Sequence, residues 1–393
     1  MGSKIVALAC RLDGLTIQEA KSVVESYVEQ CVQAPNKFEW EEAEGWLIWV
    51  YAQPKPYWTC AHSVSLNLCD RINCPYYKKK YAKELSVFEE ENPLRLIKEA
   101  LDVMVVGEDI LKMQLFLLYL TKEFDPEWCI MLDGPAASGK SHVMKAVANL
   151  FGEEGDAYFA YSRFTQSSMN HMEELAEQWR NNIVIIEELQ GMKGVVEQLR
   201  VAISEGKLTL VETTELLGPG GTKEHVTKTK EVKFDNVLFV TCNAEEFDEG
   251  EQLKSRAWIL NTDQTKDQTK EVINFYLDSF SLSKKGEVPH LEEIRSAITL
   301  LERPDKVVFP FAIELAAFVS SDTVRGRRDI KKMISLIKSS AYFHQKHRLW
   351  GEKDGRKILI ADWRDVLISF GFGGDSLNAS TQGIGSKDLQ YYE

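Results

Sequence analysis

The stretch LDGPAASGKSHVMK, residues 132–145, decides how this chain folds. Its central part, GPAASGKS, matches the pattern G-x-x-x-x-G-K-[ST], and it lies between the apolar run CIML and the helical pattern SHVMKAVANLF. Glycines and small side chains allow backbone N–H groups to surround a phosphate at the positive end of a helix. We therefore predict a phosphate-binding loop formed by Gly134, Pro135, Ala136, Ala137, Ser138, Gly139, Lys140 and Ser141.

Two residues of this loop have distinct chemical roles. Lys140 is expected to reach the β- and γ-phosphates of ATP, and Ser141 to bind Mg²⁺. The alternative is a glycine-rich turn without a ligand. The strand before the loop and the helix after it favour the phosphate site.

Four short β-prone runs predict the sheet that carries this loop. They are residues 128–134, 157–162, 182–188 and 236–243, and helical stretches separate them. Strands that alternate with helices are typical of a parallel α/β sheet. From about residue 290 onward the pattern is helical, which predicts a helical lid.

Polar side chains follow two of these runs. Glu187 and Glu188 follow the apolar residues of NIVIIEEL, and Asn243 is the last residue of NVLFVTCN. We assign Glu187 to the metal together with Ser141, Glu188 to the attacking water, and Asn243 to orienting that water. Solvated carboxylates at a strand end, and an asparagine that caps a turn, are the alternatives.

Arg256, in EQLKSRAWIL, is the candidate for a residue that acts across a subunit boundary. A guanidinium here could reach the γ-phosphate held by a neighbouring copy and stabilise charge in the transition state. This role requires a ring of subunits. An arginine in a surface ion pair is the alternative.

The order of these elements resembles the AAA+ ATPases, in particular the branch with a β-hairpin before the asparagine strand, which includes the MCM and superfamily 3 helicases. Residues 208–234 form two alternating arms around GPGG. In those helicases a hairpin in this place grips DNA in the central pore with basic residues. The resemblance therefore assigns DNA contacts to Lys223, His225 and Lys228, whereas a solvated hairpin is the alternative.

Two further stretches are similar to MCM proteins. VVGEDILKMQLFLLYL is similar to the YG-x-x-x-x-K helix of that family, and VRGRRDIKKMISLIKSSAYFHQKHR is similar to its lid helix. The lid helix implies that Arg328 reaches the nucleotide, with Arg327 as the competing candidate. The chain departs from MCM proteins at Glu187, where that family usually has Asp, and we find no N-terminal oligonucleotide-binding barrel. Phage and plasmid replication ATPases associated with primases share the same core.

A second candidate metal site lies near the N-terminus. Cys60, His62, Cys69 and Cys74 provide four ligands that suit a tetrahedral Zn²⁺. An iron–sulfur cluster that uses Cys10 or Cys31 instead of His62, and buried free thiols, are the alternatives. The chain has 7 cysteines, an odd number, so we expect no disulfide framework.

Length and composition predict several domains and no membrane contact. The chain has 393 residues and a net charge of -13, and its most apolar stretch, residues 110–120, is too short to span a bilayer. With no signal peptide evident, we expect a cytoplasmic protein. The expected divisions are an N-terminal helical Cys/His domain (1–92), an AAA+ core (93–285), a helical lid (286–372) and a flexible tail (373–393).

Taken together, the resemblance implies a ring of identical subunits, expected to be a hexamer, that hydrolyses ATP and translocates on or unwinds DNA as a replicative helicase does. Two other functions fit the same motifs: an initiator or helicase loader that uses ATP as an assembly switch, and a protein-remodelling ATPase. DNA, further copies of this chain and a primase or another replication protein are the expected partners.

Overall fold

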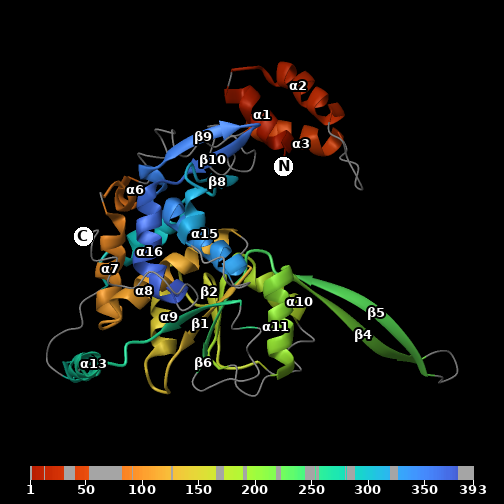
Figure 1. Ribbon diagram of the computed structural model, residues 1–393. Helices are drawn as coiled ribbons and strands as arrows, with labels where there is room; N and C mark the ends of the chain where they lie inside the picture. Colours follow the sequence, from red (N-terminus) through yellow and green to blue (C-terminus); the bar gives the residue numbers. More distant parts are fainter. Residues whose placement is uncertain are drawn as a thin grey trace. The chain divides into compact units, whose positions relative to one another are not determined.

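The computed structural model divides the chain into two compact units, Met1–Ala82 and Lys83–Glu393 (Figure 1). It describes residues 2–12, 14–30, 40–52, 82–90, 92–124, 127–164, 172–188, 193–217, 223–243, 253, 256–278, 280, 288–318 and 326–378.

The first unit contains three described helices, α1 (Gly2–Leu12), α2 (Ile17–Gln30) and α3 (Trp40–Ala52). Their apolar faces meet in a small core that includes Ala7, Val24 and Leu47. A capping box begins α2: the Thr16 backbone N–H donates to Glu19 Oε2 over 2.8 Å, and the Glu19 N–H donates to Thr16 Oγ1 over 3.4 Å. Local sequence and packing therefore agree on where this helix begins.

The second unit is built on a five-stranded parallel sheet. Its strands are β1 (Cys129–Asp133), β2 (Tyr158–Tyr161), β3 (Ile183–Ile186), β6 (Leu238–Asn243) and β7 (Ala257–Asn261), in the order β2-β3-β6-β1-β7. All four neighbouring pairs are parallel. The predicted parallel α/β sheet is thus confirmed.

Helices cover both faces of this sheet, which is why its strands are almost continuously apolar. One face, with Ile130 and Val240, packs against α7 (Pro93–Met104), α8 (Asp109–Tyr119), α9 (Lys140–Ala148), α15 (Gly326–Phe343) and α16 (Trp363–Asn378). The other face, with Met131 and Val184, packs against α10 (Met172–Trp179) and α11 (Lys193–Glu205). Of these helices, α8 is apolar on nearly all sides and is accordingly buried from Leu111 to Tyr119.

The remaining elements precede, interrupt or follow the sheet. They are α6 (Ala82–Glu89), the 3₁₀ turn η1 (Leu120–Phe124), the hairpin strands β4 (Lys207–Leu217) and β5 (Lys223–Lys233), α13 (Lys266–Asp278), α14 (Leu291–Thr299), η4 (Glu314–Phe318), η5 (Gln345–His347), and a second sheet of β8 (Lys306–Val308), β10 (Arg356–Ile360) and β9 (Leu349–Lys353). Figure 1 shows the β4–β5 hairpin projecting away from the sheet beside α10 and α11.

Two expectations about the elements are corrected. The run after Arg256 is β7, an edge strand of the main sheet, so the sheet has a fifth strand beyond the four predicted from the sequence. The segment 286–372 is also not purely helical, because β8, β9 and β10 form a sheet within it. Its β9–β10 turn carries Asp354 and Gly355 at φ +53° and +70°, and Asp-Gly between strands is a hairpin signal that we overlooked.

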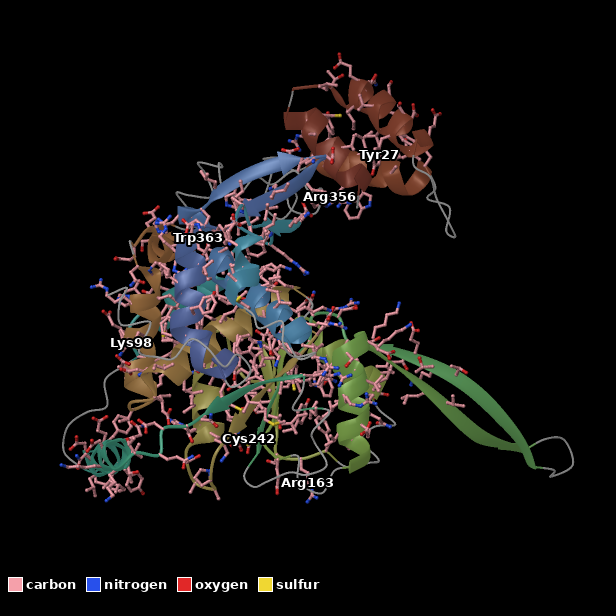
Figure 2. All side chains as sticks on the ribbon, in the orientation of Figure 1. Tyr27, Lys98, Arg163, Cys242, Arg356 and Trp363 are labelled. Carbon is pink, nitrogen blue, oxygen red and sulfur yellow. The ribbon has the colours of Figure 1, made fainter. Side chains whose placement is uncertain are left out.

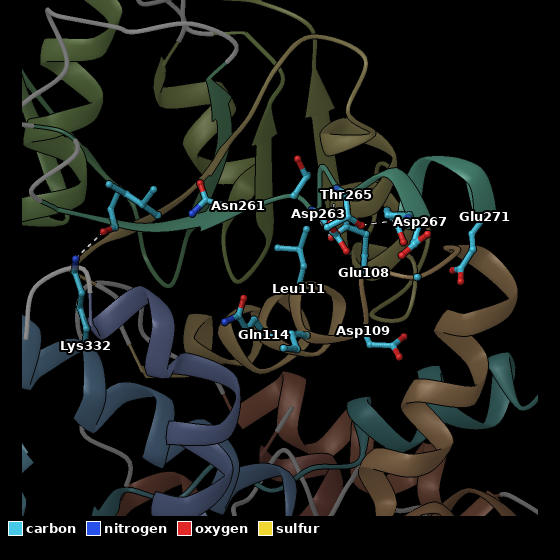
Figure 3. A pocket seen from close by; sticks show the side chains of 16 residues that line it. Glu108, Asp109, Leu111, Gln114, Asn261, Asp263, Thr265, Asp267, Glu271 and Lys332 are labelled. Atoms are coloured by element: carbon cyan, nitrogen blue, oxygen red, sulfur yellow. Dashed lines mark hydrogen bonds between the residues drawn. The ribbon is translucent and has the colours of Figure 1, made fainter. Parts of the chain in front are cut away.

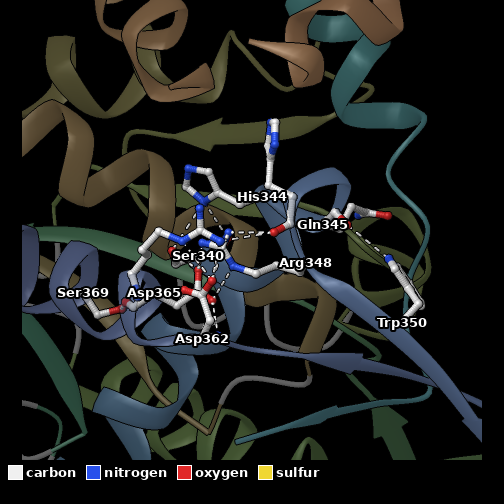
Figure 4. A network of polar contacts seen from close by, with 10 residues as sticks. Ser340, His344, Gln345, Arg348, Trp350, Asp362, Asp365 and Ser369 are labelled. Carbon is white, nitrogen blue, oxygen red and sulfur yellow. Dashed lines mark hydrogen bonds and ion pairs between the residues drawn. The ribbon is translucent and has the colours of Figure 1, made fainter. Parts of the chain in front are cut away.

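A buried polar network holds α15 to α16 (Figure 4). Arg348 donates to both carboxylate oxygens of Asp365, each over 2.8 Å, and Ser340 Oγ donates to the same carboxylate over 2.8 Å. Asp365 is completely buried. Burial also lowers the pKa of the neighbouring His344 to about 4. This network fixes how the C-terminal helix packs on the helix that carries Arg328 at its start.

Helix α16 continues beyond the position where we expected the tail to begin. It passes through Gly373 to Asn378, whereas residues 379–393 lie outside the described part. A Cβ at Gly373 would stand 2.7 Å from Leu336 and 3.7 Å from Trp258. The glycine is therefore at a place of close packing between α16, α15 and β7.

Candidate functional site

The predicted phosphate loop connects β1 to α9, as the sequence indicated. Three of its residues have positive φ: Gly134 (+148°), Ala137 (+64°) and Gly139 (+85°). Space also requires glycine at the first position, because a Cβ on Gly134 would lie 2.7 Å from Thr262 Oγ1. The loop thus closes tightly over the end of the sheet and places the first turn of α9 beside it.

Lys140 lies inside this loop. Its side chain is only 7% exposed, and Nζ donates to the carbonyl oxygens of Gly134 over 2.7 Å and Pro135 over 2.6 Å. A third contact, to Ser138 Oγ, measures 3.4 Å. The ammonium therefore both holds the loop's shape and supplies positive charge where a phosphate would bind.

The strand order brings the other predicted polar residues to the same edge of the sheet. Strand β6 lies between β1 and β3, and its last residue, Asn243, pairs with Asp133 at the root of the loop. Glu187 follows β3 directly, and its N–H donates to Tyr161 O over 2.9 Å. Glu188 is exposed beyond it.

Ser141 and Glu187 line one cavity of about 920 Å³ on the side of α9, together with Lys145 and Tyr158. Lys145 forms an ion pair with Glu187, and this contact raises the pKa of Lys145. A serine hydroxyl and a carboxylate are oxygen ligands of the kind that suit Mg²⁺. We had not predicted a role for Lys145, whose position five residues after Lys140 carries no recognisable signal.

Cys242 is another residue at this edge that sequence reasoning missed (Figure 2). Its thiol donates to the carbonyl oxygen of Glu187 and also forms a hydrogen bond with Ser141. Burial raises the pKa of Cys242, while the nearby Lys140 acts in the opposite direction. This neutral thiol therefore links the loop's serine to the backbone of the acidic strand end.

An apolar cavity of about 500 Å³ adjoins the other side of the loop. It is lined by Pro135 to Gly139, by the apolar side chains of Val105, Val106, Val272, Ile273 and Phe275, and by polar side chains that include Glu108, His142 and Asp263. Gln268 Nε2 donates to Val106 O over 2.8 Å and so ties α13 to this wall. Mostly apolar cavities with a few polar groups are the usual places for small ligands.

The turn 107–112, which we compared with the MCM helix, supports this cavity. Lys112 is 1% exposed, and its Nζ donates to Gly107 O over 2.9 Å while it pairs with Asp109 at 2.8 Å. Glu108 accepts from the Asp263 N–H over 3.0 Å, and burial raises the pKa of Glu108 to about 7. The start of α8 is thereby joined to the chain that leaves β7 (Figure 3).

Arg256 and Arg328 come together at the opposite edge of the sheet. Both line a cavity of about 200 Å³ with Lys331 and Lys332. The pKa of Arg256 is lowered first by burial and then by the charge of Arg328. The Arg256 carbonyl accepts from the N–H of Cys129, the first residue of β1, so the length of β1, about 13 Å at 3.3 Å per residue, separates the arginine from the phosphate loop.

No protein-family model matches this chain, and no curated protein does.

The two arms of the predicted DNA-binding hairpin are in continuous antiparallel register. Backbone pairing places Lys223 opposite Leu217, His225 opposite Glu215 and Lys228 opposite Glu212. At the base of the hairpin, Lys207 forms an ion pair with Glu231 at 2.8 Å. These basic residues therefore lie along an arm that extends from the body of the unit, far from the phosphate loop in sequence.

The Cys/His cluster cannot be placed, since Cys60, His62, Cys69 and Cys74 lie outside the described residues. Within the described ranges, no group of three or more His, Cys, Asp or Glu side chains could hold a metal ion. Cys10, Cys129 and Cys242 are all buried. In the same part of the chain, no helix has the length and apolar character needed to cross a membrane.

Proposed function

We propose that this chain is an ATPase of the AAA+ type that assembles as a ring and moves or unwinds DNA, as MCM helicases do. One observation carries the proposal: the phosphate loop and the arginine pair are at opposite ends of β1. Arg256 and Arg328 therefore do not meet the loop of their own chain. A second copy in a head-to-tail arrangement would bring its arginines to this loop, which is the arrangement that a shared ATP site requires.

Each residue at the carboxyl edge of the sheet then has a role. Lys140 and the loop N–H groups would hold the phosphates, and Ser141 with Glu187 would hold Mg²⁺. Glu188 and Asn243 would orient the attacking water, since they follow neighbouring strands. The apolar cavity beside the loop would take the base.

The DNA part of the proposal rests on the hairpin and on the resemblance of the chain to helicases. A net charge of -13 opposes general binding to DNA, so contact must be local. We assign this local contact to Lys223, His225 and Lys228 on β5, of which His225 and Lys228 pair with Glu215 and Glu212 on β4. In a ring, one copy of this hairpin from each subunit would multiply the contacts with phosphates.

The decisive experiment measures ATP hydrolysis with and without DNA, and strand displacement on forked DNA. We expect hydrolysis that DNA stimulates and strand separation that requires ATP. Lys140→Ala should reduce turnover at least about 100-fold, because the variant loses both the phosphate contact and the bonds that shape the loop. Lys353→Ala, on exposed β9, is the matched control and should turn over ATP normally.

The possible negative results are informative. Undiminished hydrolysis by Lys140→Ala would remove the nucleotide assignment. ATP hydrolysis that DNA stimulates, without strand displacement, would instead favour an initiator or helicase loader. ATP hydrolysis at the same rate with and without DNA would favour a protein-remodelling ATPase.

We also propose a structural Zn²⁺ held by Cys60, His62, Cys69 and Cys74, on the strength of their ligand types alone. Elemental analysis of the purified protein should find about one zinc per chain. If iron is found instead, the site is an iron–sulfur cluster. If the folded protein contains no metal, the cysteines are free thiols.

A further inference from the structure

Helix α13 carries an apolar stripe that faces solvent. Ile273, Tyr276 and Leu277 recur at helical spacing on α13, and Phe280 lies just beyond its last residue, Asp278; the four side chains are 53%, 65%, 60% and 73% exposed. The rings of Tyr276 and Phe280 meet edge to face with centroids 5.2 Å apart. We call these four residues the α13 stripe.

This exposure is unusual for a helix at the surface of a folded domain. A surface helix normally turns its apolar stripe toward the core, yet the only residue of α13 that is buried is Gln268. Contiguous exposed apolar side chains of this size mark places where another molecule binds. The α13 stripe is therefore a contact surface.

The stripe is continuous with the cavity beside the phosphate loop. Ile273 belongs to the stripe and also lines that cavity, next to Val272 and Phe275 and together with Pro135 to Gly139. A molecule that covered the stripe would consequently stand at the rim of the ATP cavity. In the proposed ring, the molecule at this rim is the next subunit.

The distribution of charge also favours a second copy of the chain. Around α13, the cavity that runs beside β7 contains the carboxylates of Glu108, Asp109, Asp263, Asp267 and Glu271 (Figure 3). At the other end of the sheet, Arg256, Arg328 and Lys331 line one small cavity, where Lys331 forms an ion pair with Glu127 at 2.5 Å. Lys332 is buried and lines both cavities, so it belongs to neither side of the contact. Carboxylates around α13 and the arginine pair Arg256 and Arg328 at the other end of the sheet are opposite charges on one molecule, which favours head-to-tail contact between identical copies.

We propose that the α13 stripe forms the apolar centre of the contact between adjacent copies of this chain. The acidic rim around it receives the arginine face of the next copy. The choice of a second copy as the binding partner rests on the proposed shared ATP site. The exposure of the stripe is independent of that proposal.

The test uses the full chain with a non-hydrolysable ATP analogue. The double variant Leu277→Glu, Phe280→Glu places charge in the stripe at two side chains that do not line the ATP cavity. Sedimentation velocity should show assembly of the unaltered chain and an association at least tenfold weaker for the variant. Binding of a fluorescent ATP analogue by single subunits should stay within twofold. Ile313→Glu, at a side chain that is 88% exposed elsewhere in the unit, is the matched control and should assemble normally.

A milder variant, Leu277→Ser with Phe280→Ser, guards against misfolding, and thermal unfolding of both variants should match that of the unaltered chain. The proposal is overturned if the folded variants assemble normally, or if the unaltered chain remains a single subunit with the nucleotide. The two proposals fail separately. If the chain assembles through α13 but binds no ATP, only the proposed ATPase function is contradicted. If the chain hydrolyses ATP and its assembly is unaffected by these substitutions, only the proposed contact at α13 is contradicted.

Discussion

Lys145, on the helix that begins at the phosphate loop, forms an ion pair with Glu187, the first carboxylate after β3. This pairing places a competing cation on the carboxylate that we assign to Mg²⁺. The same two side chains line the cavity that contains Ser141. Binding of the metal at Glu187 should therefore require Lys145 to give up its partner.

Lys145→Met should lower the Mg²⁺ concentration needed for half-maximal ATP hydrolysis by a factor of about 1.4 to 5. The size follows from the fact that partly exposed ion pairs contribute about 0.2–1 kcal/mol. A Mg²⁺ titration of ATPase activity measures this shift. Lys145→Arg keeps the charge and is the control, and an identical Mg²⁺ dependence in all three proteins would rule out the competition.

Mixed assemblies should reveal whether Arg256 acts on a neighbouring copy. Arg256→Ala and Lys140→Ala should each be inactive, because loss of an arginine finger costs about 10³- to 10⁵-fold in turnover. A mixture of the two should regain part of the activity, since intact loops from one variant meet intact arginines from the other. If an equal mixture of the two variants assembles together but stays inactive, Arg256 does not act on the ATP site of a neighbouring copy.

The hairpin residues should separate DNA coupling from hydrolysis. Lys223→Ala with His225→Ala should leave basal hydrolysis intact and remove most of the stimulation by DNA, because fewer phosphates are neutralised. Hydrolysis measured over a series of salt concentrations, with and without DNA, tests this expectation. Lys207→Ala, at the base of the hairpin, is the control. DNA stimulation that survives the double substitution would exclude these residues.

The buried pair of Arg348 and Asp365 should be essential for stability. Arg348→Met should lower the free energy of unfolding by about 3–5 kcal/mol, since it leaves the carboxylate of Asp365 buried without its cation. Arg348→Lys should cost less, because it keeps the charge but loses the two-pronged geometry. Denaturant unfolding measures both values. If Arg348→Met were as stable as the natural chain, the network would have no structural importance.

Acid should destabilise the second unit through His344. Its pKa is lowered to about 4 by burial, so the unfolded chain binds a proton between pH 6.5 and 4 that the folded chain does not. This contribution to stability is present above pH 6.5 and is lost as the pH falls toward 4. Unfolding measured from pH 8 to 4 should therefore show a smaller loss of stability in His344→Gln than in the natural chain.

Glu108 should act with the opposite sign. Its pKa is raised to about 7, so the stability associated with its protonated form is present below pH 4.5 and is lost as the pH rises through 7. Because the two groups oppose each other around pH 5 to 6, each must be compared with its own variant. Glu108→Gln should gain stability relative to the natural chain above pH 7. A constant difference across the whole pH range would contradict this assignment.

Much of the site was predictable because its residues are set by local sequence. The loop from Gly134 to Ser141 needs small residues and glycines in a fixed order, and Glu187 and Asn243 follow recognisable apolar strands. Strand ends in a parallel sheet meet at one edge, so their convergence could be expected. The walls of the cavity beside the loop could not be predicted, because Val105 and Phe275 are far apart in sequence and have no motif of their own.

Secondary structure was less predictable where strands were short or unusual. The strand β8 has three residues, and β9 has an exposed leucine beside charged residues, so neither shows clear alternation. Tertiary pairing with β10 makes them strands. The edge strand β7 was not predicted because its sequence, AWILN, is a short apolar run that periodicity cannot distinguish from part of a buried helix.

By itself, the sequence determined the glycine-rich loop after β1, the parallel sheet and the identity of the polar strand ends, since these depend on residue type and local spacing. Only the tertiary structure decided that Arg256 and Arg328 share a cavity at the far end of β1. It also decided that Lys145 faces Glu187 and that the apolar stripe of α13 faces solvent. These relationships depend on strand order and on the packing of distant segments, which no local pattern encodes.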